Sequence, residues 1–199
     1  MGRTLLPAPQ IKTHIQRLIN SGLIDGQEAR TWKKKVAAKE EKDIILAKAL
    51  DGDIQSMEVA AYRYARGIFG FEKDKAIAGY WSKKAHAAGS VFGMGITGSF
   101  LANGEGCAMN EKEGLLYLAL AAGEGSDWAA CKLGMALARG KYGLEANPSE
   151  AIRLLRKAVG DTCPHKHMTK ESRHQAQQML KVLENSSRKS SDIIITRRI

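Results

Sequence analysis

Three glycines near the middle of the chain have the spacing of a dinucleotide-binding loop. Gly93, Gly95 and Gly98 spell G-x-G-x-x-G, a pattern that lets a backbone approach a pyrophosphate at the N-terminus of a helix. That chemistry needs a buried strand before the motif and an acidic residue ending a second strand about 20 residues later. The preceding segment, K-K-A-H-A-A-G, is typical of a helix end, and no acidic residue fits the second requirement. We therefore expect no cofactor here.

A second group of residues offers metal-binding side chains. Cys163, His165 and His167 lie in the segment C-P-H-K-H, and one thiolate with two imidazoles is a possible zinc ligand set. His174 could complete a tetrahedral site. However, C-x-H-x-H is not a familiar zinc-finger spacing, and a loop broken by Pro164 accounts for the same residues. The sequence favours the loop and predicts no metal, with these three residues as a weak alternative.

The composition limits the class of protein. The chain has 199 residues, 44% of them hydrophobic, enough to bury one core with appendages. No apolar run approaches the roughly 20 residues of a membrane span. The start lacks a secretory signal, and three scattered cysteines suit a reducing compartment. We expect a cytoplasmic protein, with organelle import left open. Because no nucleophile, histidine and acid lie together locally, we expect no catalytic residues and no enzyme.

An internal repeat organises the middle of the chain. Glycines recur at positions 52, 89 and 125, and each is followed 15 residues later by another glycine. Between them, small and large apolar residues recur at spacings of 3, 4 and 7, which indicates two helices in each unit with one closely packed face. The sequence therefore predicts an all-α fold, an α/α solenoid of about three stacked helix pairs. The small columns are Ser56, Gly93 and Ala129; Ala61, Gly98 and Gly134; and Ala78, Gly114 and Ala151.

The units also share a longer motif with a known family. The third unit carries it best, with G-S-D-W-A-A-C-K-L-G-M-A-L-A-R-G over 125–140 and P-S-E-A-I-R-L-L-R-K-A-V over 148–159. The first unit has Ala61 at the glycine of the motif, and the second has Thr97 and Gly114 at its leucine and alanine. These units resemble Sel1-like repeats, relatives of the tetratricopeptide repeat. The resemblance implies a scaffold or adaptor for other proteins, with no catalytic residues.

Both flanks of the repeats are predicted to be helical. Upstream, residues 11–19 have the spacing of an amphipathic helix, and Asp25 with Glu28 forms a capping box for a helix running to about Leu50. The predicted parts are a basic N-terminal extension, residues 1–50; the repeats, 51–161, in units of about 52–88, 89–124 and 125–161; a capping helix in 162–185; and a flexible basic tail, 186–199.

The C-terminal flank combines a helix and a tail. The helix has an apolar stripe of Ala176, Met179, Leu180 and Leu183, suited to closing the solenoid. The Ser-rich start of the tail is typical of a linker, and the β-branched run 193–195 favours an extended strand. Three hypotheses remain open for the tail: it folds back into the groove, it docks on a neighbouring chain, or it is disordered.

The repeat pattern leads to a binding hypothesis. The first helix of each unit lines the concave side of such a solenoid, where a protein segment can lie. Arg66 and Arg139 occupy the same column and could hold an acidic peptide through charge-assisted hydrogen bonds. The candidate contacts are Tyr62, Arg63, Arg66, Phe100, Asn103, Lys132 and Arg139.

The charge distribution supplies an alternative partner. The net charge is +10, yet residues 51–160 carry thirteen basic against twelve acidic residues, so the excess lies in the flanks. A basic component of a ribonucleoprotein or DNA-bound assembly would contact phosphates through those flanks. A solvated helix face explains the same charges and is favoured. The possible phosphate contacts are Lys33, Lys34, Lys35, Lys39, Arg197 and Arg198.

Overall fold

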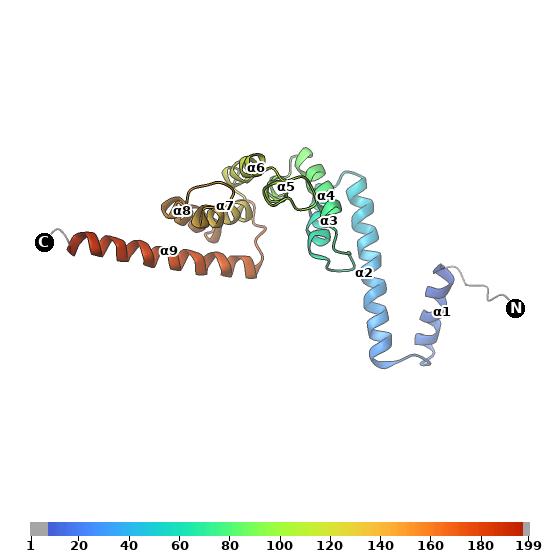
Figure 1. Ribbon diagram of the computed structural model, residues 1–199. Coiled ribbons are helices and arrows are strands. Elements are labelled where there is room, and N and C mark those ends of the chain that lie inside the picture. The colour runs from blue at the N-terminus through green and yellow to red at the C-terminus, as the bar shows by residue number, and fades with distance from the viewer. Residues whose placement is uncertain (1–7, 197–199) are drawn as a thin grey trace.

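The computed structural model describes residues 8–196, and over this range the chain is all-α, with nine helices and no sheet (Figure 1). The predicted α/α solenoid is confirmed. The helices are α1 (Ala8–Asn20), α2 (Gly26–Leu50), α3 (Ile54–Arg66), α4 (Lys75–Ala87), α5 (Val91–Asn103), α6 (Glu111–Gly123), α7 (Asp127–Arg139), α8 (Pro148–Val159) and α9 (Lys170–Thr196).

The 15-residue glycine interval corresponds to one capped helix. The first helices of the three units, α3, α5 and α7, are each 13 residues long. In α5, the hydroxyl of Ser90 accepts a hydrogen bond from the N–H of Gly93, and the helix ends at Gly104 with φ 65°. A short polar N-cap satisfies an orphan amide, and glycine takes the left-handed C-cap at no steric cost. Local chemistry therefore sets the repeat.

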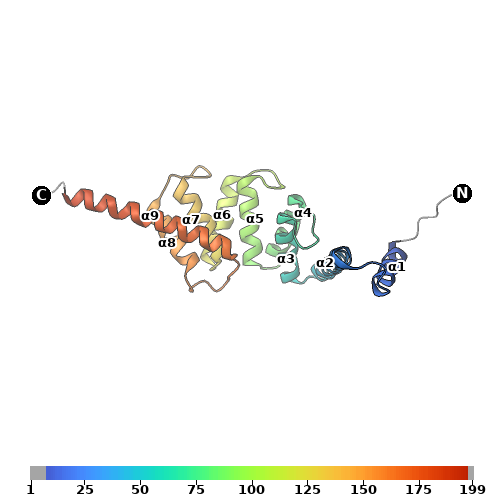
Figure 2. The ribbon, with the colours of Figure 1, turned by 90° about the horizontal axis from the view of Figure 1, so that it is seen from below.

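The helices stack in order as pairs, α3 with α4, α5 with α6, and α7 with α8. Seen from below, α5 to α8 lie side by side and α9 crosses the end of the row (Figure 2). α2 contacts α3 in the way that α4 contacts α5, so α2 takes the place of a second helix. α9 contacts both α7 and α8, just as α7 contacts both α5 and α6, so α9 takes the place of a first helix. The solenoid thus has an additional half unit at each end of its three pairs.

The G-x-G-x-x-G motif lies inside α5, where it lets three helices approach closely. A Cβ on Gly93 would lie 2.8 Å from the Cβ of Ala85 in α4, and one on Gly98 would lie 2.8 Å from the carbonyl oxygen of Gly114 in α6. Real Cβ atoms do not make such contacts. The repeat positions of Gly93 and Gly98 therefore need small residues because the helices pack closely there.

Two connected clusters form the core. One gathers residues of α2 to α5, including Tyr64, Trp81 and Phe92, and the other gathers residues of α6 to α9, including Leu118 and Leu155. Trp128 packs against both clusters. Many of the other core residues are fully buried alanines, so close helix approach carries much of the packing.

The stripe predicted for the capping helix does face the core. Ala176 is fully buried in the second cluster, and Met179, Leu180 and Leu183 pack against it. At the position in α9 that corresponds to Gly98 and Gly134, the chain has the exposed Gln177. In the repeat units, the second helix packs on the small residue at this position. No described helix follows α9, so the long polar side chain of Gln177 is accommodated there.

Two local predictions differ from the structure. Asp25 sits at the N-cap position of α2, but its side chain makes no capping hydrogen bond, because Gly26 at φ 61° turns the chain out of helical geometry. At the other end, α9 continues to Thr196 through the expected linker and the 193–195 run. Residues 170–196 contain no glycine or proline, and extending a formed helix is easier than starting one.

In the described chain, no helix is both long and apolar enough to cross a membrane.

Candidate functional site

A pocket of about 290 Å³ opens between α5 and α7. We call it the α5–α7 pocket. Its apolar part includes Phe100 and Leu118, both buried, with Trp128 and Met135 from α7. Its polar rim comes from α5, from α7 and from the loops that follow these two helices. The rim residues are Ser99, Asn103, Glu105, Lys132, Arg139, Lys141 and Tyr142.

The rim of the α5–α7 pocket is positively charged. Lys132, Arg139 and Lys141 are exposed, and none of them forms an ion pair with a residue of 9–188, the range in which the structure describes side chains. Glu105, the one acid among the lining residues, is already paired with Lys75 at 3.0 Å. The three cations are therefore available to an anionic group that enters the pocket.

One rim cation is also held in place by an aromatic ring. The Nζ of Lys132 lies 5.2 Å from the ring centre of Trp128, one turn earlier on α7. A cation over an aromatic face is attracted by the ring quadrupole. The contact places a charge directly beside the apolar part of the pocket.

A strained loop residue closes one side of the pocket. Tyr142 has φ 59°, in the left-handed region, and its hydroxyl donates a hydrogen bond to the side-chain oxygen of Asn103 at 2.9 Å. Phe69 occupies the same loop position in the first unit with φ 53°, and the second unit has Gly106 there with φ 69°. Bulky residues rarely adopt this conformation. The hydrogen bond across the pocket helps to hold Tyr142 in it.

The structure gathers only some of the residues predicted for the groove. Phe100, Asn103, Lys132 and Arg139 all line the α5–α7 pocket. The candidates on α3 do not line it. Arg66 lies against its own neighbour, with its guanidinium 4.9 Å from the ring centre of Tyr62. Arg66 and Arg139 occupy the same repeat position, but only Arg139 lines the α5–α7 pocket.

Arg63 contributes to the packing of the first unit. It occupies the same position in its helix as Phe100 and Ala136, both buried. Its guanidinium forms an ion pair with Glu41 of α2 at 2.7 Å and lies 4.7 Å from the ring centre of Phe69. A charge in a packed column requires such a partner. The neighbouring helix α2 supplies it, so Arg63 takes part in the packing of the first unit and does not line the α5–α7 pocket.

The predicted phosphate contacts divide in a similar way. Lys34, Lys35 and Lys39 line one pocket beside α2, whereas Lys33 does not line it. Arg197 and Arg198 lie outside the described residues.

The possible zinc ligands do not converge. The thiol of Cys163 faces the carbonyl oxygen of Lys157 at 3.3 Å, while the imidazole of His167 stacks on Phe92 with ring centres 4.2 Å apart. Among the side chains that the structure describes, no group of three His, Cys, Asp or Glu residues could hold a metal ion. The segment is a loop between α8 and α9.

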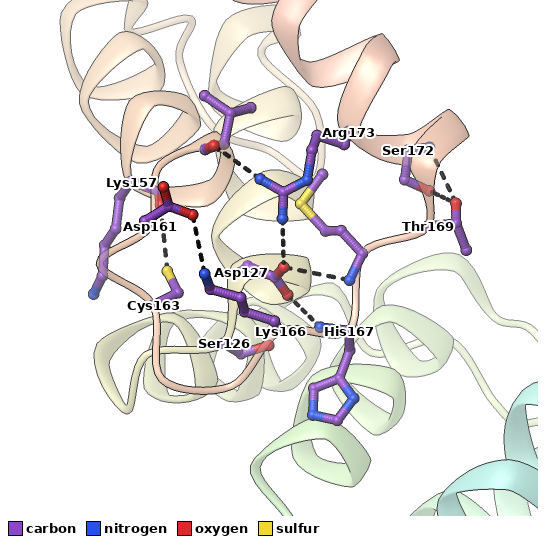
Figure 3. Close-up of polar contacts among 12 residues, drawn as sticks. Ser126, Asp127, Lys157, Asp161, Cys163, Lys166, His167, Thr169, Ser172 and Arg173 are labelled. Carbon is purple, nitrogen blue, oxygen red and sulfur yellow. Dashed lines mark hydrogen bonds and ion pairs between the residues drawn. The ribbon is translucent and has the colours of Figure 1, made fainter.

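The residue that organises this loop was missed in the sequence. Asp127, at the start of α7, is fully buried. Its carboxylate accepts hydrogen bonds from the backbone N–H groups of His167 at 2.7 Å and Met168 at 3.3 Å, and lies 3.4 Å from the guanidinium of Arg173 in α9 (Figure 3). A signal was present, since Ile54 and Val91 fill this position in the other units.

Solved structures with the same architecture exist. The chain is similar to the Sel1 repeat protein from Oxalobacter formigenes, with 26% identity and a TM-score of 0.49, over 72% of this chain and 52% of that one. It is also similar to c5321, a protective antigen present in uropathogenic Escherichia coli strains displaying an SLR fold. That match has 18% identity and a TM-score of 0.51, over 78% of this chain and 38% of the other. The fold is that of Sel1-like repeats.

The similarity concerns architecture. The chain spans about half of the first Sel1-like repeat structure and less of the second. Comparisons with protein-family models and with curated proteins find no match. In Sel1-like terms, α3, α5 and α7 are the first helices of their units, and the α5–α7 pocket lies between two of them.

Proposed function

We propose that this protein is an interaction scaffold that binds an acidic segment of a partner protein in the α5–α7 pocket. The observation that carries the proposal is the set of three exposed cations, Lys132, Arg139 and Lys141, around a pocket that has one apolar wall and whose one acid, Glu105, is already paired. Solenoids built from helical repeats present extended binding surfaces, which agrees with such a role.

The pocket chemistry suits a mixed apolar and acidic ligand. An apolar side chain of the partner packs against Trp128 and Met135, and a carboxylate is held by Arg139 through charge-assisted hydrogen bonds. Aromatic and methionine side chains are common anchors at protein interfaces. The hydroxyl of Tyr142 and the amide of Asn103 are already bonded to each other, so they shape the rim.

The test is selection of peptides from a display library on the immobilised full chain, followed by fluorescence anisotropy with the selected peptide. We expect acidic peptides with one large apolar residue. Exchanging Lys132→Gln together with Arg139→Gln should weaken their binding about tenfold or more, because two charge-assisted contacts are lost.

The matched control is Lys112→Gln together with Lys170→Gln, which removes the same charge at exposed positions outside the pocket. It should bind the peptide almost as the parent does. Selected peptides without acidic residues, or equal losses in both double variants, would refute the pocket as the binding site.

A further inference from the structure

A second basic surface lies outside the repeats, where α2 projects beyond α3 (Figure 1). The α3–α4 loop meets α2 there and leaves a pocket of about 480 Å³, which we call the α2 notch. Four lysines of α2 line it, and Gly70 and Glu72 of the loop line the opposite side. The lysines are Lys34, Lys35, Lys39 and Lys42.

Two of the acids on α2 near these lysines form ion pairs with other residues. Glu40 pairs with Lys12 of α1, and Glu41 pairs with Arg63 of α3. Two acids remain at the notch, Asp43 and Glu72, against four cations. None of the four lysines belongs to an ion pair in the described part of the chain. The notch therefore carries a net positive charge.

The cations form a track along the helix. From Lys34 to Lys42 the rise is about 12 Å at 1.5 Å per residue, long enough to meet more than one phosphate of an extended strand. Of the residues that line the notch, only Ala38 and Gly70 lack a charge, and none has an aromatic or a branched apolar side chain. It thus lacks the anchors that the α5–α7 pocket offers to a peptide, and its chemistry favours a ligand that is charged throughout.

An exposed aromatic ring stands next to this track. Phe69 is 61% exposed and directly precedes Gly70. The loop is pressed against α2 at that point, because a Cβ on Gly70 would lie 2.9 Å from the carbonyl oxygen of Ala38. The guanidinium of Arg63 lies 4.7 Å from the ring centre of Phe69. Phe69 thus belongs to a loop that is packed against α2, next in sequence to a residue that lines the notch, and most of its surface is open.

We propose that the α2 notch binds single-stranded nucleic acid. A positively charged groove that follows the backbone, combined with an aromatic side chain on which a base stacks, is the arrangement by which single strands are bound without base-specific readout. Lys34, Lys35 and Lys39 contact phosphates, and Phe69 stacks on a base. The site is separate from the α5–α7 pocket, so one chain can join a protein partner to a nucleic acid.

The experiment measures binding of the full chain to a fluorescein-labelled oligothymidylate of about 15 nucleotides by anisotropy, across salt concentrations from about 50 to 200 mM. Each phosphate contact to a single strand adds about 0.7 to the slope of log K against log salt. The triple variant Lys34→Gln, Lys35→Gln and Lys39→Gln should lose at least tenfold in affinity, and its slope should fall by about 2.

Two further variants make the test specific. The control Lys112→Gln, Lys170→Gln and Lys181→Gln removes the same charge from exposed residues outside the notch and should bind nearly as the parent does. Phe69→Ala should lose about tenfold in affinity through stacking while keeping the parent slope. Circular dichroism confirms that each variant is folded.

Three results would overturn the proposal. One is absence of binding by the parent chain at the lowest salt. Another is an equal loss in both triple variants, which would assign binding to net charge alone. The third is displacement of the oligonucleotide by polyglutamate at matched charge as efficiently as by unlabelled oligonucleotide, which would identify an acidic protein segment as the ligand.

Discussion

The carboxylate of Asp127 at the start of α7 lies 3.4 Å from the guanidinium of Arg173 in α9, and the two residues together fix the loop that joins α8 to α9. Arg173 also donates a hydrogen bond to the carbonyl oxygen of Val159, the last residue of α8, at 2.8 Å. Asp127 and Arg173 together thus connect three helices and one loop (Figure 3). This arrangement accounts for the geometry of the C-P-H-K-H segment.

Exchange of Asp127→Asn should destabilise the protein by about 2 to 4 kcal/mol, because Arg173 loses its partner and the buried group accepts fewer hydrogen bonds. Urea unfolding followed by circular dichroism measures the effect. Glu150→Gln is the control, since its pair with Arg153 is exposed, and it should cost less than about 0.5 kcal/mol. Similar losses in the two variants would contradict a structural role for Asp127.

The glycines of α5 should respond differently to the same substitution. A Cβ on Gly98 meets backbone atoms of α6 at 2.8 and 2.9 Å, whereas one on Gly95 makes ordinary contacts at 3.4 Å or more. Gly98→Ala should therefore destabilise the fold by about 1 to 3 kcal/mol. Gly95→Ala should be neutral or stabilise it by up to about 1 kcal/mol through helix propensity. Thermal unfolding measures the stability of both variants. A Gly95→Ala variant less stable than the Gly98→Ala variant would refute the packing argument.

Stability at high pH should depend on Cys131. Burial raises the pKa of the Cys131 thiol to about 11, above the value of about 8.5 in an unfolded chain. The folded state therefore keeps its proton while the unfolded state loses one. The contribution is fully present below pH about 8.5 and is lost by pH about 11, up to about 3 kcal/mol.

Urea unfolding from pH about 8 to about 11 measures this dependence. In Cys131→Ala the free energy of unfolding should fall less steeply with pH than in the parent. Identical slopes in the two proteins would show that Cys131 ionises equally in both states.

Disruption of α9 should unfold one end of the solenoid first. Ala176 is fully buried against residues of α7 and α8, so Ala176→Glu places a charge in the second core cluster. In a stacked array each unit contacts only its neighbours. Hydrogen exchange should then show lost protection in α7 to α9 and retained protection in α3 and α4. The control is Gln177→Glu at the neighbouring exposed position, which should leave both regions protected. A uniform loss of hydrogen-exchange protection across the chain in Ala176→Glu would contradict the prediction.

The sequence by itself determined the repeat, the helix pairs and most helix limits. These features depend on neighbours within a few turns. Ser90 caps an amide three residues away, Gly104 takes a left-handed conformation at its own position, and small columns recur because each helix needs one close face. The small residues Gly93 and Gly98 were correctly assigned to packing for the same reason. Periodicity and capping are local, and a single chain displays them.

The tertiary structure alone decided which charges are available. Arg63 and Arg139 both lie on first helices, yet Arg63 meets Glu41, 22 residues earlier in the chain, while Arg139 makes no ion pair in the described residues and lines a pocket. Asp127 reaches a loop 40 residues later. Such pairings follow from which helices meet in space and how far each side chain is buried, because a buried charge must find a partner wherever the fold places one.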